Sequence, residues 1–93
     1  MGKLTGTEVT KRLGEVKEWK KVKSEITRTF TFKDFNGSMR FVNAVAKEAE
    51  KANHHPDIDI RWNKVTLTLS THDAGGLTEK DFALAKKSDQ LAE

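Results

Sequence analysis

Pro56, the only proline of this chain, separates two kinds of hydrophobic pattern. Before it, apolar residues between Ser38 and about Asn53 recur at the spacing of one helix face. After it, two short segments alternate apolar and polar residues, as half-buried strands do. A residue that precedes proline is driven out of the helical region, so the helix ends before His55, and Asn53 fits a left-handed C-cap.

The two alternating segments, residues 57–62 and 65–70, predict a hairpin. Asn63–Lys64 separates them, and two residues are enough for a hairpin turn. In this register Trp62 is opposite Val65, so that Trp62 turns toward the apolar face of the sheet and serves as structural packing.

The same register predicts that two histidines become neighbours. Extending it beyond Pro56 places His55 opposite His72, where the Cβ atoms of directly opposed residues are about 5 Å apart. We therefore expect a histidine pair at the open end of the hairpin.

Helix and strand patterns also fill the first third of the chain. Apolar residues up to Val16 recur at helical spacing behind Thr5 or Thr7, which predicts a first helix that ends near Val16. Two strands follow. The second alternates over residues 26–32, with Arg28 as the one discordant inward position.

The remaining segments supply turns and a last helix. Residues 34–38 are turn and capping residues, and residues 73–76 are expected to form a flexible loop. Thr78 is the expected N-cap of the last helix, with Asp81 as its capping-box partner and Phe82 facing the core. The pattern thus predicts three helices and four strands in a single domain, residues 1–93.

Composition excludes several classes of protein. The sequence has no cysteine, which excludes disulfides and cysteine-ligated metal sites and favours a reducing cytoplasm. The longest apolar runs are two or three residues, and the N-terminus lacks the apolar core of a secretory signal. Neither a membrane span nor export is expected.

Positive charge is concentrated near the N-terminus. Residues 1–33 carry nine Lys and Arg against four Asp and Glu, whereas residues 34–93 carry eight against ten. Nucleic-acid binding would need basic residues interleaved with aromatic ones, and residues 17–23 are the only such stretch. A solvated edge strand guarded by lysines is the favoured interpretation, so no nucleic-acid partner is expected.

All three histidines of the chain lie within nineteen residues, from His54 to His72. Imidazole titrates near pH ~6.5, so this group suits proton transfer at neutral pH. His54 and His55 follow a helix C-terminus, and Glu50 lies one turn before His54, which favours the protonated imidazole. Zinc is the alternative, but adjacent histidines rarely ligate one ion and the carboxylates are scattered, so no metal is expected.

Seven positions have a spacing that resembles the signature of the pterin-4a-carbinolamine dehydratases, Glu50-x3-His54-His55-Pro56-x5-Trp62-x9-His72-x8-Asp81. The resemblance extends over almost the whole chain and is loosest in the first thirty residues.

The resemblance implies both a fold and a function. The fold is α+β, with two layers: a four-stranded antiparallel sheet and three helices packed on one face. The implied reaction is dehydration of 4a-hydroxytetrahydrobiopterin to quinonoid dihydropterin, with no metal or organic cofactor. The reaction recycles the cofactor of aromatic amino acid hydroxylases, which implies a functional link to such an enzyme. Family members form homodimers or homotetramers, and some animal members also bind a homeodomain transcription factor.

The resemblance also assigns roles within the site. His54 and His72 would transfer protons, and His55 would bind substrate or transfer a proton. Asp81 would orient His72 and stabilise its protonated form, and Glu50 would act similarly on His54. The residues expected to bind the pterin are Asn53, His54, His55, Ser70, Thr71, His72 and Asp73.

Two other functions remain open at this point. The chain could be a protein-binding module, such as a transcriptional coactivator, that uses the same fold. It could also act on another reduced pterin, for example a molybdopterin-related compound. No residue identifies the C6 side chain of a pterin.

Overall fold

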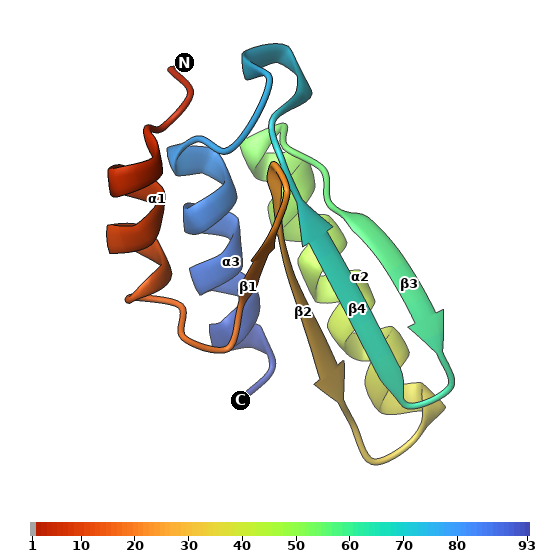
Figure 1. The fold of residues 1–93 in the computed structure, drawn as a ribbon. Helices are drawn as coiled ribbons and strands as arrows, with labels where there is room; N and C mark the ends of the chain where they lie inside the picture. The colour runs from red at the N-terminus through yellow and green to blue at the C-terminus, as the bar shows by residue number, and fades with distance from the viewer. Residues whose placement is uncertain (1) are drawn as a thin grey trace.

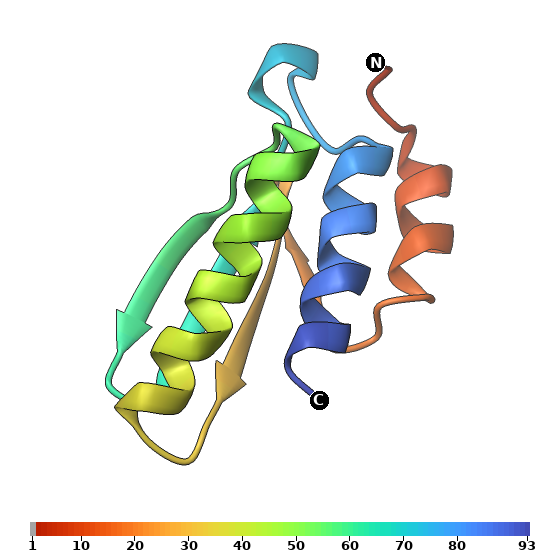
Figure 2. The same cartoon turned by 180° about the vertical axis from the view of Figure 1, so that it is seen from behind.

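The computed structural model describes residues 2–93 as an α+β fold of two layers (Figure 1). The four strands form one antiparallel sheet in the order β1-β2-β4-β3. Figures 1 and 2 show the three α-helices on the same side of this sheet, as predicted. No helix in residues 2–93 is both long and apolar enough to cross a membrane. The elements are α1 (Gly6–Leu13), β1 (Lys20–Val22), β2 (Glu25–Thr31), α2 (Phe35–Ala52), β3 (Asp57–Arg61), β4 (Lys64–Leu69), the 3-10 turn η1 (His72–Ala74) and α3 (Glu79–Leu91).

Helix α1 begins at the predicted cap and ends earlier than predicted. The Thr5 hydroxyl accepts a hydrogen bond from the Glu8 amide, and the Glu8 carboxylate accepts one from the Thr5 amide. The helix ends at Leu13 because Gly14 and the two residues after it form tight turns. Val16, the predicted last residue, is buried in this turn region and still contributes to the core.

Helix α2 begins earlier than Ser38, where the apolar pattern starts. Asp34 is the N-cap, and its carboxylate accepts a hydrogen bond from the Gly37 amide at 2.8 Å. The first helical residue is therefore Phe35. At the other end Asn53 has φ 50°, which confirms the predicted left-handed cap.

The predicted register of the β3–β4 hairpin is wrong by two residues. Ile60 pairs with Val65, so the turn consists of Trp62 and Asn63. A shift of two keeps the apolar residues on the same face, because side chains alternate with a period of two. It does remove Trp62 from the sheet face: its side chain is 67% exposed and its φ is 53°.

Contacts outside the hairpin explain this turn. The Phe32 amide donates to the Asn63 carbonyl at 2.7 Å, and the Asn63 side-chain amide donates back to the Phe32 carbonyl. The Ser38 hydroxyl donates to the Trp62 carbonyl at 2.7 Å. Together these bonds connect the turn to the end of β2 and the first turn of α2.

The core lies between the sheet and the helices, and it explains the inward position of Arg28. Arg28 donates to the Asp89 carboxylate on α3 at 2.6 Å, and its guanidinium lies 4.2 Å from the centre of the Phe30 ring. The Trp19 indole N–H donates to the same carboxylate at 2.8 Å. Arg28 faces inward because Asp89 compensates its charge there.

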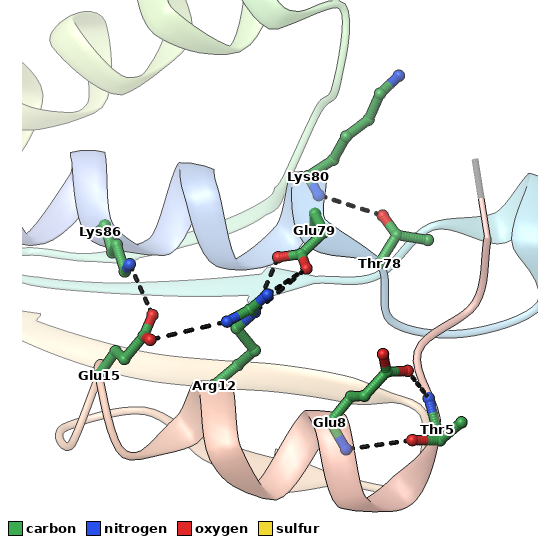
Figure 3. A network of polar contacts seen from close by, with 8 residues as sticks. All are labelled: Thr5, Glu8, Arg12, Glu15, Thr78, Glu79, Lys80 and Lys86. Atoms are coloured by element: carbon green, nitrogen blue, oxygen red, sulfur yellow. Dashed lines mark hydrogen bonds and ion pairs between the residues drawn. The ribbon is translucent and has the colours of Figure 1, made fainter.

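Helix α1 and the turn that follows it are connected to α3 by two ion pairs at the surface (Figure 3). Arg12 donates to the Glu79 carboxylate, and Lys86 lies 2.6 Å from the Glu15 carboxylate. The hydrogen bond from Arg12 lowers the pKa of Glu79. The bond from Lys86 lowers the pKa of Glu15 in the same way. These contacts orient α1 along α3 at the side remote from α2.

Candidate active site

His54 points into the protein because of the cap that precedes it. The left-handed Asn53 reverses the chain at the end of α2, and the His54 amide donates to the Ala49 carbonyl at 3.1 Å. The His54 residue is only 8% exposed. His55, one residue later, is exposed, so the two adjacent histidines point in different directions.

His54 forms a buried pair with Asp81 on the first turn of α3. The Nε2 atom of His54 lies 2.6 Å from the Oδ1 atom of Asp81, whose residue is completely buried. The second carboxylate oxygen accepts hydrogen bonds from the Thr78 amide at 2.9 Å and the Thr71 hydroxyl at 2.8 Å. Asp81 is thus the predicted capping-box residue and the partner of a histidine at once.

A chain of two hydroxyls supports this pair. The Thr71 and Thr78 hydroxyl oxygens are 2.9 Å apart. The Thr71 hydroxyl donates its hydrogen bond to Asp81, so in the contact between the two threonines Thr78 is the donor and Thr71 the acceptor. Three segments therefore meet at one carboxylate: the end of α2, the residues after β4, and the start of α3.

The other ring nitrogen of His54 is not bonded to the described part of the chain. Nδ1 has no hydrogen-bond partner within residues 2–93. In that range Ser88 Oγ is the only fully buried side-chain polar atom without a partner, so Nδ1 itself is not fully buried. With Nε2 bonded to Asp81, a substrate would meet His54 at Nδ1.

Glu50 contacts His55 and not His54, which corrects the predicted pairing. The Glu50 carboxylate lies 2.5 Å from Nε2 of His55. Glu50 sits on the outer face of α2, where His55 also emerges, whereas His54 turns inward. Both side chains are more than half exposed, so the pair contributes little to stability.

His72 lies in η1 and is exposed. The prediction that Asp81 orients His72 is wrong, because the Asp81 oxygens are bonded to His54, Thr71 and Thr78.

The predicted opposition of His55 and His72 is also wrong. Asp57 pairs with Thr68, and extending that register takes His55 to Ser70. Residues 72–74 leave the strand direction as a 3-10 turn, closed by the bridge between Thr71 and Gly76.

The other residues expected to bind substrate lie around the same end of the fold. Asn53 is the exposed cap of α2, Ser70 is half-buried after β4, and Asp73 is exposed in η1. The side-chain role of Thr71 was missed by sequence reasoning. A capping box predicts that Asp81 reaches back to Thr78, but no local pattern indicates the long-range contacts to Thr71 and His54.

Within residues 2–93, no three His, Asp or Glu side chains gather as ligands of a metal ion would. The buried group at this site is a histidine–carboxylate pair with two supporting hydroxyls. Such a pair is chemically suited to exchanging a proton at one imidazole nitrogen while the carboxylate fixes the other.

Comparison with known proteins places this chain among related sequences and structures. A family model described as "Pterin 4 alpha carbinolamine dehydratase" matches residues 2–91. A protein of Picosynechococcus sp. named "Putative pterin-4-alpha-carbinolamine dehydratase" is 54% identical over 89 residues, covering 96% of this chain and 97% of its own.

Two solved structures have a similar fold. A "transcriptional coactivator/pterin dehydratase" from Brucella melitensis superposes with a TM-score of 0.96 and 38% identity, covering 99% of this chain and 100% of its own. A "pterin dehydratase-like protein", described as a RuBisCO assembly factor in the alpha-carboxysome, superposes with a TM-score of 0.69 and 27% identity. That similarity covers 81% of this chain and 89% of the other.

Proposed function

The chain belongs to the pterin 4-alpha-carbinolamine dehydratase family, and from this premise we propose that it dehydrates 4a-hydroxytetrahydrobiopterin to quinonoid dihydropterin by histidine acid–base catalysis. The observation that carries the proposal is the buried contact between His54 and Asp81, with Nδ1 of His54 left free for a ligand.

The reaction needs one acid and one base. Protonation of the 4a-hydroxyl lets the C4a–O bond break and water leave. Loss of the N5 proton to a base completes the C4a=N5 double bond, so the proton gained by the hydroxyl balances the one lost from N5. No metal or redox group takes part in this step.

The proposed roles follow the geometry of the site. His54 exchanges a proton with the substrate through Nδ1, and Asp81 fixes the ring and stabilises the positive charge that forms when Nδ1 takes up a proton. The exposed His72 is the second proton-transfer group. His55, with Glu50 beside it, binds substrate or exchanges a proton.

The backbone near these groups is the proposed pterin site. Ser70, Thr71 and Asp73 follow β4, and Asn53 follows α2, so each lies within two residues of a histidine along the chain. The proposed substrate is the product of an aromatic amino acid hydroxylase, and a chain without cysteine suits the reducing cytoplasm in which such a cofactor would be recycled.

Self-association is part of the same proposal. Within residues 2–93, four large apolar side chains are exposed on the single chain, and burial against a second copy would remove apolar surface from water. They are Val22, Phe35, Ile58 and Trp62. Sedimentation velocity at micromolar concentration would show a homodimer or homotetramer if this holds, and a monomer if it does not.

Two alternative functions differ in whether they need the histidines. The names of the two solved relatives point to coactivation and to assembly of another protein, so a binding module is the rival function. A dehydratase acting on a molybdopterin-related or other reduced pterin is the second. A docking protein would work without its histidines, whereas either dehydratase would not.

The experiment is stopped-flow absorbance of the carbinolamine, generated in situ by a hydroxylase, as it decays to the quinonoid product. Wild type is compared with His54→Ala, His72→Ala and the double variant, with Lys47→Ala on the outer face of α2 as the control. We expect each single variant to lower turnover at least tenfold while circular dichroism shows a folded chain.

The carbinolamine also dehydrates unaided, so each rate is compared with the spontaneous rate, and three outcomes are distinguished. Acceleration by wild type and by Lys47→Ala, lost in the double histidine variant, supports the proposed mechanism. Full activity of a folded double variant would remove the histidines from it. No acceleration by wild type would favour another pterin or the binding function.

A further inference from the structure

A pocket of about 240 Å³ opens at the end of the molecule where α2 ends and α3 begins. It lies between the N-terminal segment, the turn that joins β1 to β2, and the residues before α3, which lie near one another in Figure 1. Part of its lining is apolar and comes from Leu4, Val9 and Leu77. The Leu4 amide donates to the Leu77 carbonyl at 2.8 Å, which fixes two of these walls against each other.

Three lysines from three different segments line the same pocket. They are Lys3 in the N-terminal segment, Lys21 in β1 and Lys23 in the turn after it. In the part of the chain that the structure describes, no carboxylate lies within ion-pair distance of any of them. Other basic groups nearby do have partners: Arg12 and Lys86 are both bonded to glutamates.

The backbone holds two of these lysines in place. The Lys3 side chain crosses directly over Gly76, where an added Cβ atom would lie 2.9 Å from Lys3 Cε. A glycine is therefore needed for Lys3 to take this path. Lys23 has φ 57°, a left-handed conformation that fixes the direction of the hairpin turn.

The pocket is also connected to the buried histidine pair. Gly76, beneath Lys3, exchanges two backbone hydrogen bonds with Thr71 at 3.0 and 3.3 Å. The Thr71 hydroxyl in turn donates to Asp81, the partner of His54. Thr71 therefore bonds both to Gly76 in the pocket wall and to the Asp81 carboxylate.

We propose that this lysine pocket binds a small organic anion. Its carboxylate or phosphate group would contact the ammonium groups of Lys3, Lys21 and Lys23, and its apolar part would cover Leu4 and Leu77. Three cations without a counterion repel one another, so an anion that lies between them gains from each. The anionic group comes from either of two sources: a substituent on the pterin, or a separate small molecule.

The first test is a titration of the protein with phenyl phosphate, followed by amide shifts in nitrogen–proton correlation spectra. The variant is Lys3→Gln/Lys21→Gln/Lys23→Asn, in which Asn is chosen because it tolerates the left-handed conformation. The control, Lys17→Gln/Lys47→Gln/Lys64→Gln, has the same net charge and changes exposed lysines outside the pocket.

We expect shifts centred on Ser24 and Gly76, and a dissociation constant at least ten times higher in the pocket variant than in the control. Equal affinity of the two variants, or no saturable shift in wild type, would overturn the proposal. Thermal unfolding of each variant checks that it is folded.

Gly76→Ala tests the same site without changing any charge. Its Cβ would displace only the flexible end of Lys3, so the fold should tolerate it. Phenyl phosphate should then bind severalfold more weakly, although all three lysines are present. Unchanged affinity would contradict the role of Lys3.

A second titration distinguishes the two sources of the anion. It compares 6-hydroxymethyl-7,8-dihydropterin with its phosphate ester, neither of which requires turnover. At least tenfold tighter binding of the ester, lost in the pocket variant, assigns the pocket to a substituent of the pterin. Equal binding of the two, with phenyl phosphate still bound, assigns it to a separate anion. These titrations measure binding, so their result is independent of whether the chain dehydrates a carbinolamine.

Discussion

The Nε2 atom of His54 lies 2.6 Å from Oδ1 of Asp81, although the two residues are 27 positions apart. The contact ties the end of α2 to the first turn of α3. Nε2 of His54 is bonded to Asp81, whereas Nδ1 has no partner within residues 2–93. The carboxylate therefore has two separable functions, in capping α3 and in orienting the imidazole.

Asp81→Asn should lower the turnover of carbinolamine dehydration at least tenfold. An amide at this position caps the helix less well and no longer balances the positive charge that forms on His54 in the proposed proton transfer. The matched control is Asp89→Asn, eight residues along the same helix, whose carboxylate accepts hydrogen bonds from Trp19 and Arg28 instead. Stopped-flow rates within twofold of each other for the two variants would contradict the role of Asp81.

Thr71→Val should reduce turnover severalfold and destabilise the fold by about 1–3 kcal/mol. It removes a donor to Asp81 and leaves the buried Thr78 hydroxyl without its acceptor. Thr71→Ser keeps the hydroxyl and should restore most of both properties. Chemical denaturation and steady-state kinetics measure the stability and turnover of both variants. Equal stability and equal turnover of Thr71→Val and Thr71→Ser would show that the hydroxyl has no part in the site.

The ion pairs between α1 and α3 should make stability depend on pH in the acid range (Figure 3). Hydrogen bonds from Arg12 and Lys86 lower the pKa values of Glu79 and Glu15 below the usual value of a glutamate. A lowered folded-state pKa contributes stability above about pH 4.5, and this contribution is lost as the pH falls through the folded-state value. Both carboxylates are at the surface, so salt should weaken the effect.

The measurement is the thermal unfolding midpoint between pH 3 and pH 6. Glu15→Gln/Glu79→Gln should flatten the dependence relative to wild type, whereas Glu18→Gln, which removes a carboxylate outside these pairs, should leave it nearly unchanged. Identical pH profiles for the double variant and wild type would contradict a role for these ion pairs.

Local sequence signals were sufficient for most of the fold. The caps at Thr5, Asn53 and Thr78 were found because capping depends on residues within one turn of each other. Periodicity predicted three helices and four strands, and the family resemblance implied the α+β class. The hairpin register failed because Asn63 is held by Phe32, and Ser38 contacts the neighbouring carbonyl; both partners are remote in sequence.

The sequence singles out the residues of the candidate site, but it predicts their contacts incorrectly. The family signature in the sequence contains the histidines and Asp81, but it does not show which of these side chains contact each other. Asp81 was assigned to His72 and Glu50 to His54, whereas the structure pairs them with His54 and His55. The left-handed turn at Asn53 decides this, because it sends one histidine inward and the next outward.

Trp62 should be replaceable by glycine with a gain in stability of about 0.5–1 kcal/mol in the isolated chain. A large side chain at φ 53° is strained, and glycine adopts this region freely, which outweighs its greater entropy in the unfolded state. The indole is 67% exposed, so little burial is lost. Chemical denaturation at low protein concentration measures the change, with Trp62→Ala as the control that removes the indole but keeps the strain. If Trp62→Gly and Trp62→Ala both lower stability, and do so more strongly as protein concentration rises, the indole is buried between copies of the chain and the strain is retained for that contact.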